Sequence, residues 1–133
     1  MIIDFDIGNL KKRQKTEFLC DGEILYWSVY DFAYKYRTRI FNNRNEEVAY
    51  VEKDILIDDK ANLYDYRGNK IDEITKTAQG YKTSKYQYSG SIDKGEAEGL
   101  FINEEGKLSV FDEKNVLSAV MFSAGVIEIA RKD

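Results

Sequence analysis

The chain has 133 residues, enough for one domain with its own hydrophobic core, and its 43% apolar and 33% charged residues indicate an ordered globular protein. The net charge of -4 gives no general attraction to nucleic acid or to anionic membranes. The absence of His excludes the usual general base at neutral pH and every Ser-His-Asp or Cys-His arrangement, while the single Cys excludes an internal disulfide.

The sequence predicts a single domain at 1–133, with a lead-in segment at 1–15, strands at 16–111 and a C-terminal helix at 112–131. Asp4 and Asp6 interrupt the apolar start of the chain, which argues against a secretory signal or an anchor there. The lone thiol of Cys20 suits a reducing compartment. The expected location is therefore the cytoplasm.

The region 16–111 has the two-residue period of β-strands, with aromatic and β-branched residues between short polar turns. In "YKYRTRIF" the alternation predicts one face that packs and one that is charged. The packing face holds Tyr34, Tyr36, Thr38 and Ile40, and the charged face holds Lys35, Arg37, Arg39 and Phe41.

Two segments match each other without gaps, "IFNNRNEEVAYV" at 40–51 and "LYDYRGNKIDEI" at 63–74. Each predicts a strand, a tight turn and a second strand. The stretches "YVEKDILI" at 50–57 and "GYKTSKYQYSGS" at 80–91 predict further extended segments. About eight or more antiparallel strands are expected, and closing them into a barrel hides both the sheet edges and the apolar face.

The most apolar stretch, Val116–Ala130, predicts a helix of about four turns. Its polar residues, Ser118, Ser123 and Glu128, fall five positions apart and scatter around the helix, so that no face is polar. The uncharged run at 115–127 has 13 residues, well short of the roughly 20 that span a bilayer. A helix that is apolar on every side is expected to be surrounded by protein.

The predicted fold is mainly β: a closed antiparallel barrel of short hairpins wrapped around the hydrophobic C-terminal helix. The alternative is an α+β domain in which the helix packs on one face of an antiparallel sheet. Small residues are expected where strands approach the helix closely, at Ser118, Ser123, Ala124 and Gly125. Glu128 is expected near the barrel mouth, within reach of water or Arg131; inside the barrel it would need a partner such as an Arg or a Tyr hydroxyl.

The hairpin "LYDYRGNKIDEI" and the ending "FDEKNVLSAVMFSAGVIEIARKD" resemble the tubby C-terminal-like superfamily, which includes the LURP-one-related proteins, their small bacterial relatives and the phospholipid scramblases. The resemblance covers most of the chain from about Phe18 onward. It implies a closed barrel around a hydrophobic C-terminal helix. For function it implies contact with phosphoinositide headgroups through basic side chains, as in tubby domains, or peripheral association with membranes and calcium, as in scramblases.

The candidate ligand site is a group of cations that could grip the phosphate oxygens of an anionic headgroup. Its residues are Lys11, Lys12, Arg13, Lys15, Lys35, Arg37 and Arg39. The competing interpretation is a solvated outer surface in a protein with 24 acidic residues, since runs of charge are more often surface than site.

Several acidic clusters could in principle bind calcium or serve acid and base chemistry. They comprise Asp58, Asp59, Asp93, Glu96, Glu98, Glu104, Glu105, Asp112 and Glu113. None follows the calcium-loop pattern, and the segment before the helix lacks the alternating Asp residues of scramblases, so no metal and no cofactor is expected.

Aromatic residues interleaved with Lys and Arg could stack bases, although alternation along the strands predicts that many pack in the core instead. They are Tyr26, Trp27, Tyr30, Tyr34, Tyr36, Tyr81, Tyr86 and Tyr88. Cys20 has no His to activate it and is expected to be a strand residue rather than a nucleophile.

The first functional hypothesis is a non-enzymatic binding or scaffold protein that contacts anionic lipid headgroups or a protein partner through its outer basic face. Because the helix fills the barrel, no large internal ligand cavity is expected. The alternative is an enzyme that uses carboxylates and Tyr in a surface cleft, which requires converging acids, one of them with a raised pKa. Nucleic-acid binding is disfavoured by the acidic net charge.

Overall fold

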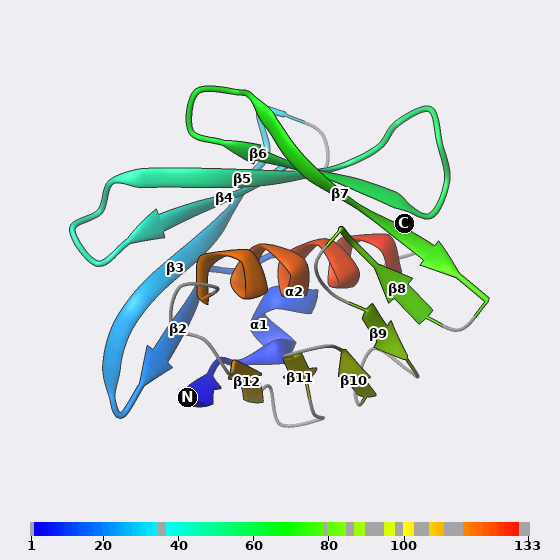
Figure 1. Ribbon diagram of the computed structural model, residues 1–133. Helices are drawn as coiled ribbons and strands as arrows, with labels where there is room; N and C mark the ends of the chain where they lie inside the picture. The colour runs from blue at the N-terminus through cyan, green and yellow to red at the C-terminus, as the bar shows by residue number, and fades with distance from the viewer. Residues whose placement is uncertain are drawn as a thin grey trace.

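The computed structural model describes residues 2–34, 37–78, 80–84, 87–89, 95–97, 100–102, 107–110 and 116–130. These residues form twelve strands and two helices (Figure 1). The strands are β1 (Ile2–Asp4), β2 (Thr16–Cys20), β3 (Glu23–Asp31), β4 (Arg37–Asn42), β5 (Glu47–Lys53), β6 (Lys60–Asp65), β7 (Lys70–Thr77), β8 (Gly80–Lys82), β9 (Gln87–Ser89), β10 (Gly95–Ala97), β11 (Leu100–Ile102) and β12 (Lys107–Val110). The helices are α1 (Ile7–Lys11) and α2 (Val116–Ala130).

Every strand pair in the structure is antiparallel, and strands from β2 to β12 follow one another in chain order around the sheet. β1 completes the ring, because it pairs with β12 through three residue pairs and with β2 through a single pair, Asp4 with Leu19. The predicted antiparallel, mainly β architecture is confirmed. Among the described strands, two neighbouring pairs, β1–β2 and β9–β10, are joined by one residue pair each.

Helix α2 lies within the helix predicted at 112–131, whose residues 112–115 and 131 are outside the described part of the chain. All residues of α2 are buried except Leu117, Ser118 and Ala130. In Figure 1 it lies between the long strands β4 to β7 and a second layer of α1 and short strands. Among the strands, α2 packs most extensively against β5 and β6. This packing of a helix on one face of an antiparallel sheet agrees with the predicted alternative. Among the described residues, no helix combines the length and hydropathy needed to cross a bilayer.

Gly125 allows α2 to approach the sheet closely. A Cβ atom added there would lie 2.2 Å from Cδ1 of Ile74 on β7 and 3.4 Å from Cγ1 of Val51 on β5. Both neighbouring side chains are fully buried, so neither has free space to move into. The packing role expected of this small residue is confirmed.

Residues 2–15 are part of the fold rather than a lead-in to it. Ile3 on β1 is completely buried, and Phe5 and Leu10 are nearly so. The ring of Phe5 packs against that of Phe18 on β2, with centroids 5.0 Å apart. Asp6 caps α1 by accepting a hydrogen bond from the N–H group of Asn9 at 3.0 Å. This segment therefore closes one side of the core.

The predicted repeat is confirmed in the hairpins β4–β5 and β6–β7. Asn42 and Asp65 hold equivalent positions, and Oδ1 of each accepts two backbone N–H groups of its turn at 2.9–3.0 Å. Asn45 and Gly68 take the left-handed backbone conformation at equivalent positions, with φ of 63° and 88°. The register shifts at the same point of both ladders. The two turns thus share the same side-chain-to-backbone hydrogen bonds and the same position of positive φ.

One predicted extended segment is partly wrong. The stretch at 50–57 leaves the sheet after Lys53, and residues 54–59 form a loop between β5 and β6. The cause is Asp54, whose Oδ1 accepts the N–H groups of Leu56 and Ile57 at 2.9 and 2.8 Å and so turns the chain away from the ladder. The other predicted segment, at 80–91, contains β8 and β9 as expected.

Candidate functional site

Arg39, a predicted headgroup ligand on β4, is engaged by two carboxylates on the outer face of the sheet. Its Nε donates to Oδ2 of Asp31 on β3 at 2.6 Å, and its Nη1 donates to Oε1 of Glu47 on β5 at 2.7 Å. The bond from Arg39, helped by one from the Ala33 N–H, lowers the pKa of the Asp31 carboxyl below its ordinary value. Arg39 therefore joins three strands to one another.

Arg37, on the same face of β4, forms an ion pair with Glu52 on β5. Its guanidinium also lies 4.0 Å from the ring centroid of Tyr34 and 4.2 Å from that of Tyr50. Thr38 and Ile40, the residues between and beyond the two arginines, are buried. The predicted division of β4 into a charged and a packing face is confirmed, and the charged face is neutralised within the sheet.

Arg13 points toward the core rather than toward a ligand. Its Nε and Nη2 donate to Oε1 and Oε2 of Glu128 on α2, both at 3.3 Å, and its guanidinium lies 4.4 Å from the ring centroid of Tyr30. The expected place of Glu128, open to water at the barrel mouth, is wrong, because this carboxylate is only 2% exposed. The other expected partner, Arg131, lies outside the described residues.

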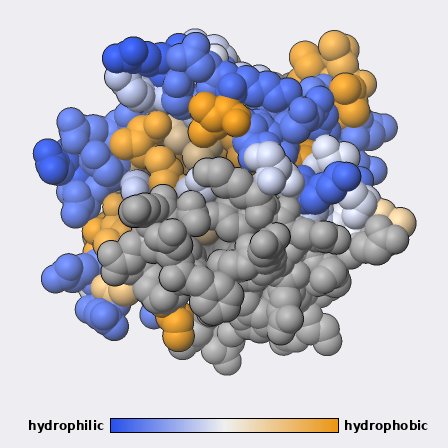
Figure 2. Space-filling model, viewed as in Figure 1, coloured by the Kyte–Doolittle hydropathy of each residue, from blue (hydrophilic) through white to orange (hydrophobic). Residues whose placement is uncertain are grey.

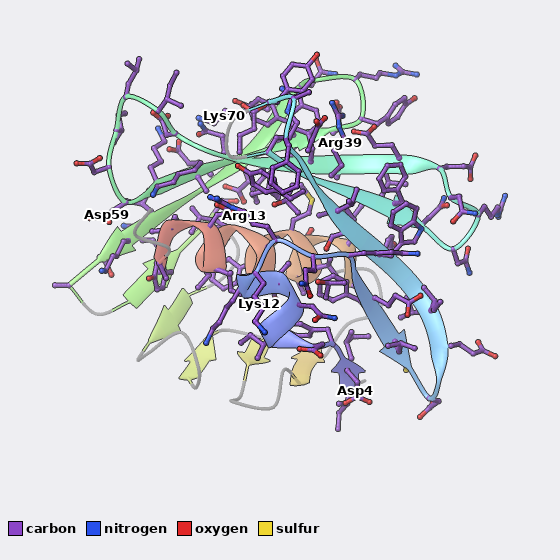
Figure 3. The ribbon with its side chains drawn as sticks, turned by 180° about the vertical axis from the view of Figure 1, so that it is seen from behind. Asp4, Lys12, Arg13, Arg39, Asp59 and Lys70 are labelled. Carbon is purple, nitrogen blue, oxygen red and sulfur yellow. The ribbon has the colours of Figure 1, made fainter. Side chains whose placement is uncertain are left out.

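Of the predicted lysines, the structure describes Lys11, Lys12 and Lys15. Lys12 and Lys15 are exposed, and Figure 3 shows Lys12 beside α1, away from Arg39 on the sheet. Lys15 lies over the Trp27 ring, 4.7 Å from its centroid, and lines an open hollow of about 250 Å³. The hollow is also lined by Asp6, Asn9, Glu17 and Leu19. Lys11 ends α1, and Lys35 lies outside the described residues. The six described cations of the predicted set do not form one patch.

The predicted core role of the aromatic residues is confirmed for Tyr30 and Tyr81, which are 8% and 5% exposed. Trp27 instead lies on the outer face, stacked on Phe41 with centroids 4.2 Å apart, and its Nε1 donates to Oδ1 of Asn45 at 3.0 Å. Tyr26 is half-buried and Tyr34 is exposed. The side chains of Tyr36, Tyr86 and Tyr88 are outside the described part of the structure.

The carboxylates of the described residues form no group that could hold a metal ion. Asp58 and Asp59 are exposed, and the other acidic candidates lie where no side chain is described. A hollow of about 100 Å³ beside Met121 contains the carboxylate of Asp72, which accepts a hydrogen bond from the Ser84 hydroxyl at 2.6 Å. No second described carboxylate lines it.

The enzyme alternative requires a carboxyl group with a raised pKa, whereas the shifted carboxyl pKa values of the described residues are lowered. Hydrogen bonds to backbone and side-chain donors lower the pKa of Asp54 and Asp65, and the ammonium of Lys60 lowers that of Glu73. These carboxyl groups are held ionised, so they are poor general acids at neutral pH.

Three consecutive exposed apolar side chains lie on the β5–β6 loop, among them Leu56, the most exposed large apolar residue of the described chain. Ile55, Leu56 and Ile57 are 75%, 89% and 53% exposed. In Figure 2 this loop forms an apolar projection at the upper right of a largely hydrophilic upper surface. The sequence carries a signal for it, since three consecutive large aliphatic residues between Asp54 and Asp58 break the alternation of a half-buried strand.

The described surface therefore has two distinctive features. One is the ion-paired face of β3, β4 and β5, on which Arg37 and Arg39 both have carboxylate partners. The other is the apolar β5–β6 loop. In comparisons with protein-family models, curated proteins and solved structures, the chain has no match.

Proposed function

We propose that this chain is a non-enzymatic binding or scaffold protein that acts through its exterior. The observation that carries the proposal is the occupation of the interior by α2, where Val120 and Phe122 are fully buried. Small-molecule sites are usually cavities of about 300–1,000 Å³. The hollow beside Met121 is smaller, at about 100 Å³. Recognition by the outer surface is the role that this arrangement favours.

The charges of that surface favour a protein partner over an anionic headgroup. Arg37 and Arg39 would have to leave Glu52, Asp31 and Glu47 before they could bind a phosphate. Lys15 shares its hollow with two acidic residues, which reduce the local positive potential. The strongest phosphate ligands of the predicted set are thus already engaged.

We retain the relationship to the tubby C-terminal-like superfamily as part of the proposal. The ring of antiparallel strands and the apolar helix within it support that relationship. The family's headgroup-binding role has less support, because Arg37 and Arg39 of the predicted headgroup site are ion-paired.

The proposal is tested by purifying the tagged full chain from its native cells and by sedimenting it with phosphatidylcholine vesicles, with and without phosphoinositide. We expect a protein to co-purify in stoichiometric amount and no phosphoinositide-dependent sedimentation. The alternative result is phosphoinositide-dependent sedimentation that is lost in the double variant Lys12→Glu with Lys15→Glu but kept in Arg37→Gln with Arg39→Gln. That result would assign the protein to headgroup binding instead. If no protein co-purifies and the chain does not bind vesicles, the proposed binding role is contradicted.

A further inference from the structure

We infer that the β5–β6 loop is the docking element of this protein and that its partner is a protein with an apolar pocket rimmed by basic residues. The inference rests on the proposed binding function and names the surface and the partner's chemistry.

The apolar side chains at the tip of this loop do not pack in the core of the protein. Leu56 is 89% exposed and Ile55 is 75% exposed, so neither side chain contributes to the core. Isolated exposed apolar residues are ordinary, but consecutive ones at one projecting site are typical of interaction surfaces. Burying such side chains on a partner would remove apolar surface from water and so favour binding.

The loop is held in one shape before any partner arrives. Oδ1 of Asp54 accepts the N–H groups of Leu56 and Ile57, and its Oδ2 accepts an amide hydrogen of Asn62 on β6 at 3.1 Å. The N–H of Asp54 donates to the carbonyl of Lys60 at 2.9 Å, which closes the base of the loop. A preformed loop loses little conformational entropy on binding, and this favours affinity.

A second apolar loop emerges at the same end of the sheet. β3 and β5 run in the same direction on either side of β4, and Asp31, Arg37 and Glu52 stand side by side in one row. Phe32, directly after that row, is 80% exposed. Since adjacent strands are about 4.8 Å apart, the two loops start about 10 Å from each other. Phe32 and the β5–β6 loop therefore lie at the same end of the sheet.

The charges beside the loop decide between a protein and a membrane. Asp58 and Asp59 follow Ile57 directly, and both are exposed. An anionic bilayer would repel them, and inserting the loop would move carboxylates toward hydrocarbon, which is costly. Basic side chains at the rim of a partner's pocket would pair with them. The apolar tip with its acidic flank therefore fits a protein partner.

The experiment places a photo-crosslinking amino acid at position 56 of the full chain in its native cells, with position 71 as the matched control. Ile71 is 55% exposed on β7, beside the turn at the opposite end of the sheet. We expect one protein adduct from position 56 and none from position 71. The adduct protein is then identified, produced and titrated against purified variants.

Leu56→Ser with Ile57→Ser is expected to weaken that partner's binding by about tenfold or more, and Asp58→Lys with Asp59→Lys by a similar factor that shrinks at high salt. Ile71→Ser should leave it unchanged. Thermal unfolding checks that each variant is folded.

Unchanged affinity of the serine variant overturns the inference while the binding role stands, since the partner then binds elsewhere. An adduct to a second copy of this chain, or vesicle binding that requires Leu56, also overturns it. If neither position yields an adduct and nothing co-purifies, both the inference and the proposed function fail.

Discussion

Arg13 links two parts of the molecule that are 115 positions apart in the chain. It has a left-handed backbone, with φ of 60°, directly after α1, and its side chain reaches the buried carboxylate of Glu128 on α2. Tyr30 lies against the guanidinium. This ion pair ties the N-terminal segment to the core helix, which is a structural role for a residue predicted to bind ligand.

Removing the charge of Glu128 should therefore destabilise the fold. In Glu128→Gln, the largely buried guanidinium of Arg13 loses the charge of this carboxylate, which costs about 3 kcal/mol. The free energy of unfolding from urea titration measures the loss. The double variant Arg13→Met with Glu128→Met should recover most of it, because neither charge is then buried alone. A Glu128→Gln protein as stable as the wild type would show that the pair contributes nothing.

The partners of single charged residues were the part of the site that sequence could not predict. The alternation along β4 places Arg37 and Arg39 on the outer face, as the structure confirms. Whether such residues are available to a ligand depends on the register of β3 and β5 beside them, and register is set by turns and bulges rather than by β4 itself. Similarly, no local pattern pairs Arg13 with a residue of α2.

At the scale of elements, the two twin hairpins differ in the residue that has positive φ, Asn45 in one and Gly68 in the other. Asn adopts this conformation more readily than other residues with a side chain, and Gly adopts it freely. The repeat was predictable because the turn chemistry is local. The β5–β6 loop was missed because its apolar composition is typical of a strand, and only the bonds of Asp54 turn the chain away.

This difference predicts a graded response at Gly68. Gly68→Ala should cost about 1–2 kcal/mol, because a side chain disfavours the left-handed conformation. The new Cβ would also lie 3.3 Å from the hydroxyl oxygen of Tyr50. Gly68→Asn should cost less on the backbone, as its twin position shows, and thermal unfolding of the two variants measures the order. If Ala is tolerated better than Asn, strain at this turn is not the controlling factor.

At the scale of the whole molecule, the burial of α2 was predictable, because a helix without a polar face is stable when other parts of the protein surround it. The closing of the ring was harder to predict in detail. It depends on β1, which has three residues, too few for a two-residue period to identify a strand.

Stability should be nearly constant at neutral pH and should fall in acid. The carboxyl pKa values of Asp31, Asp54, Asp65 and Glu73 are lowered in the folded chain by hydrogen bonds, so the unfolded chain binds protons first as pH falls. Their contribution is complete above the ordinary pKa values of 3.8 for Asp and 4.5 for Glu and is lost as pH falls through and below them. The chain has no His to titrate between about pH 6 and 8.

Calorimetric Tm values should therefore form a plateau from about pH 6 to 8 and decline below about pH 5. The matched control is Arg39→Gln, which removes the main donor to Asp31 and should make the acid decline shallower. A Tm that rises on acidification would contradict a stabilising role of these ionised carboxylates.

The position of α2 after all the strands has a consequence for synthesis. The ribosome makes β2 to β7 before it makes the helix on which they pack, and β1 must wait for β12, more than a hundred residues later, before their ladder can form. Such distant contacts slow folding and leave apolar strand faces uncovered in the nascent chain. Cells making this protein must keep an unfinished chain from aggregating until its core has emerged.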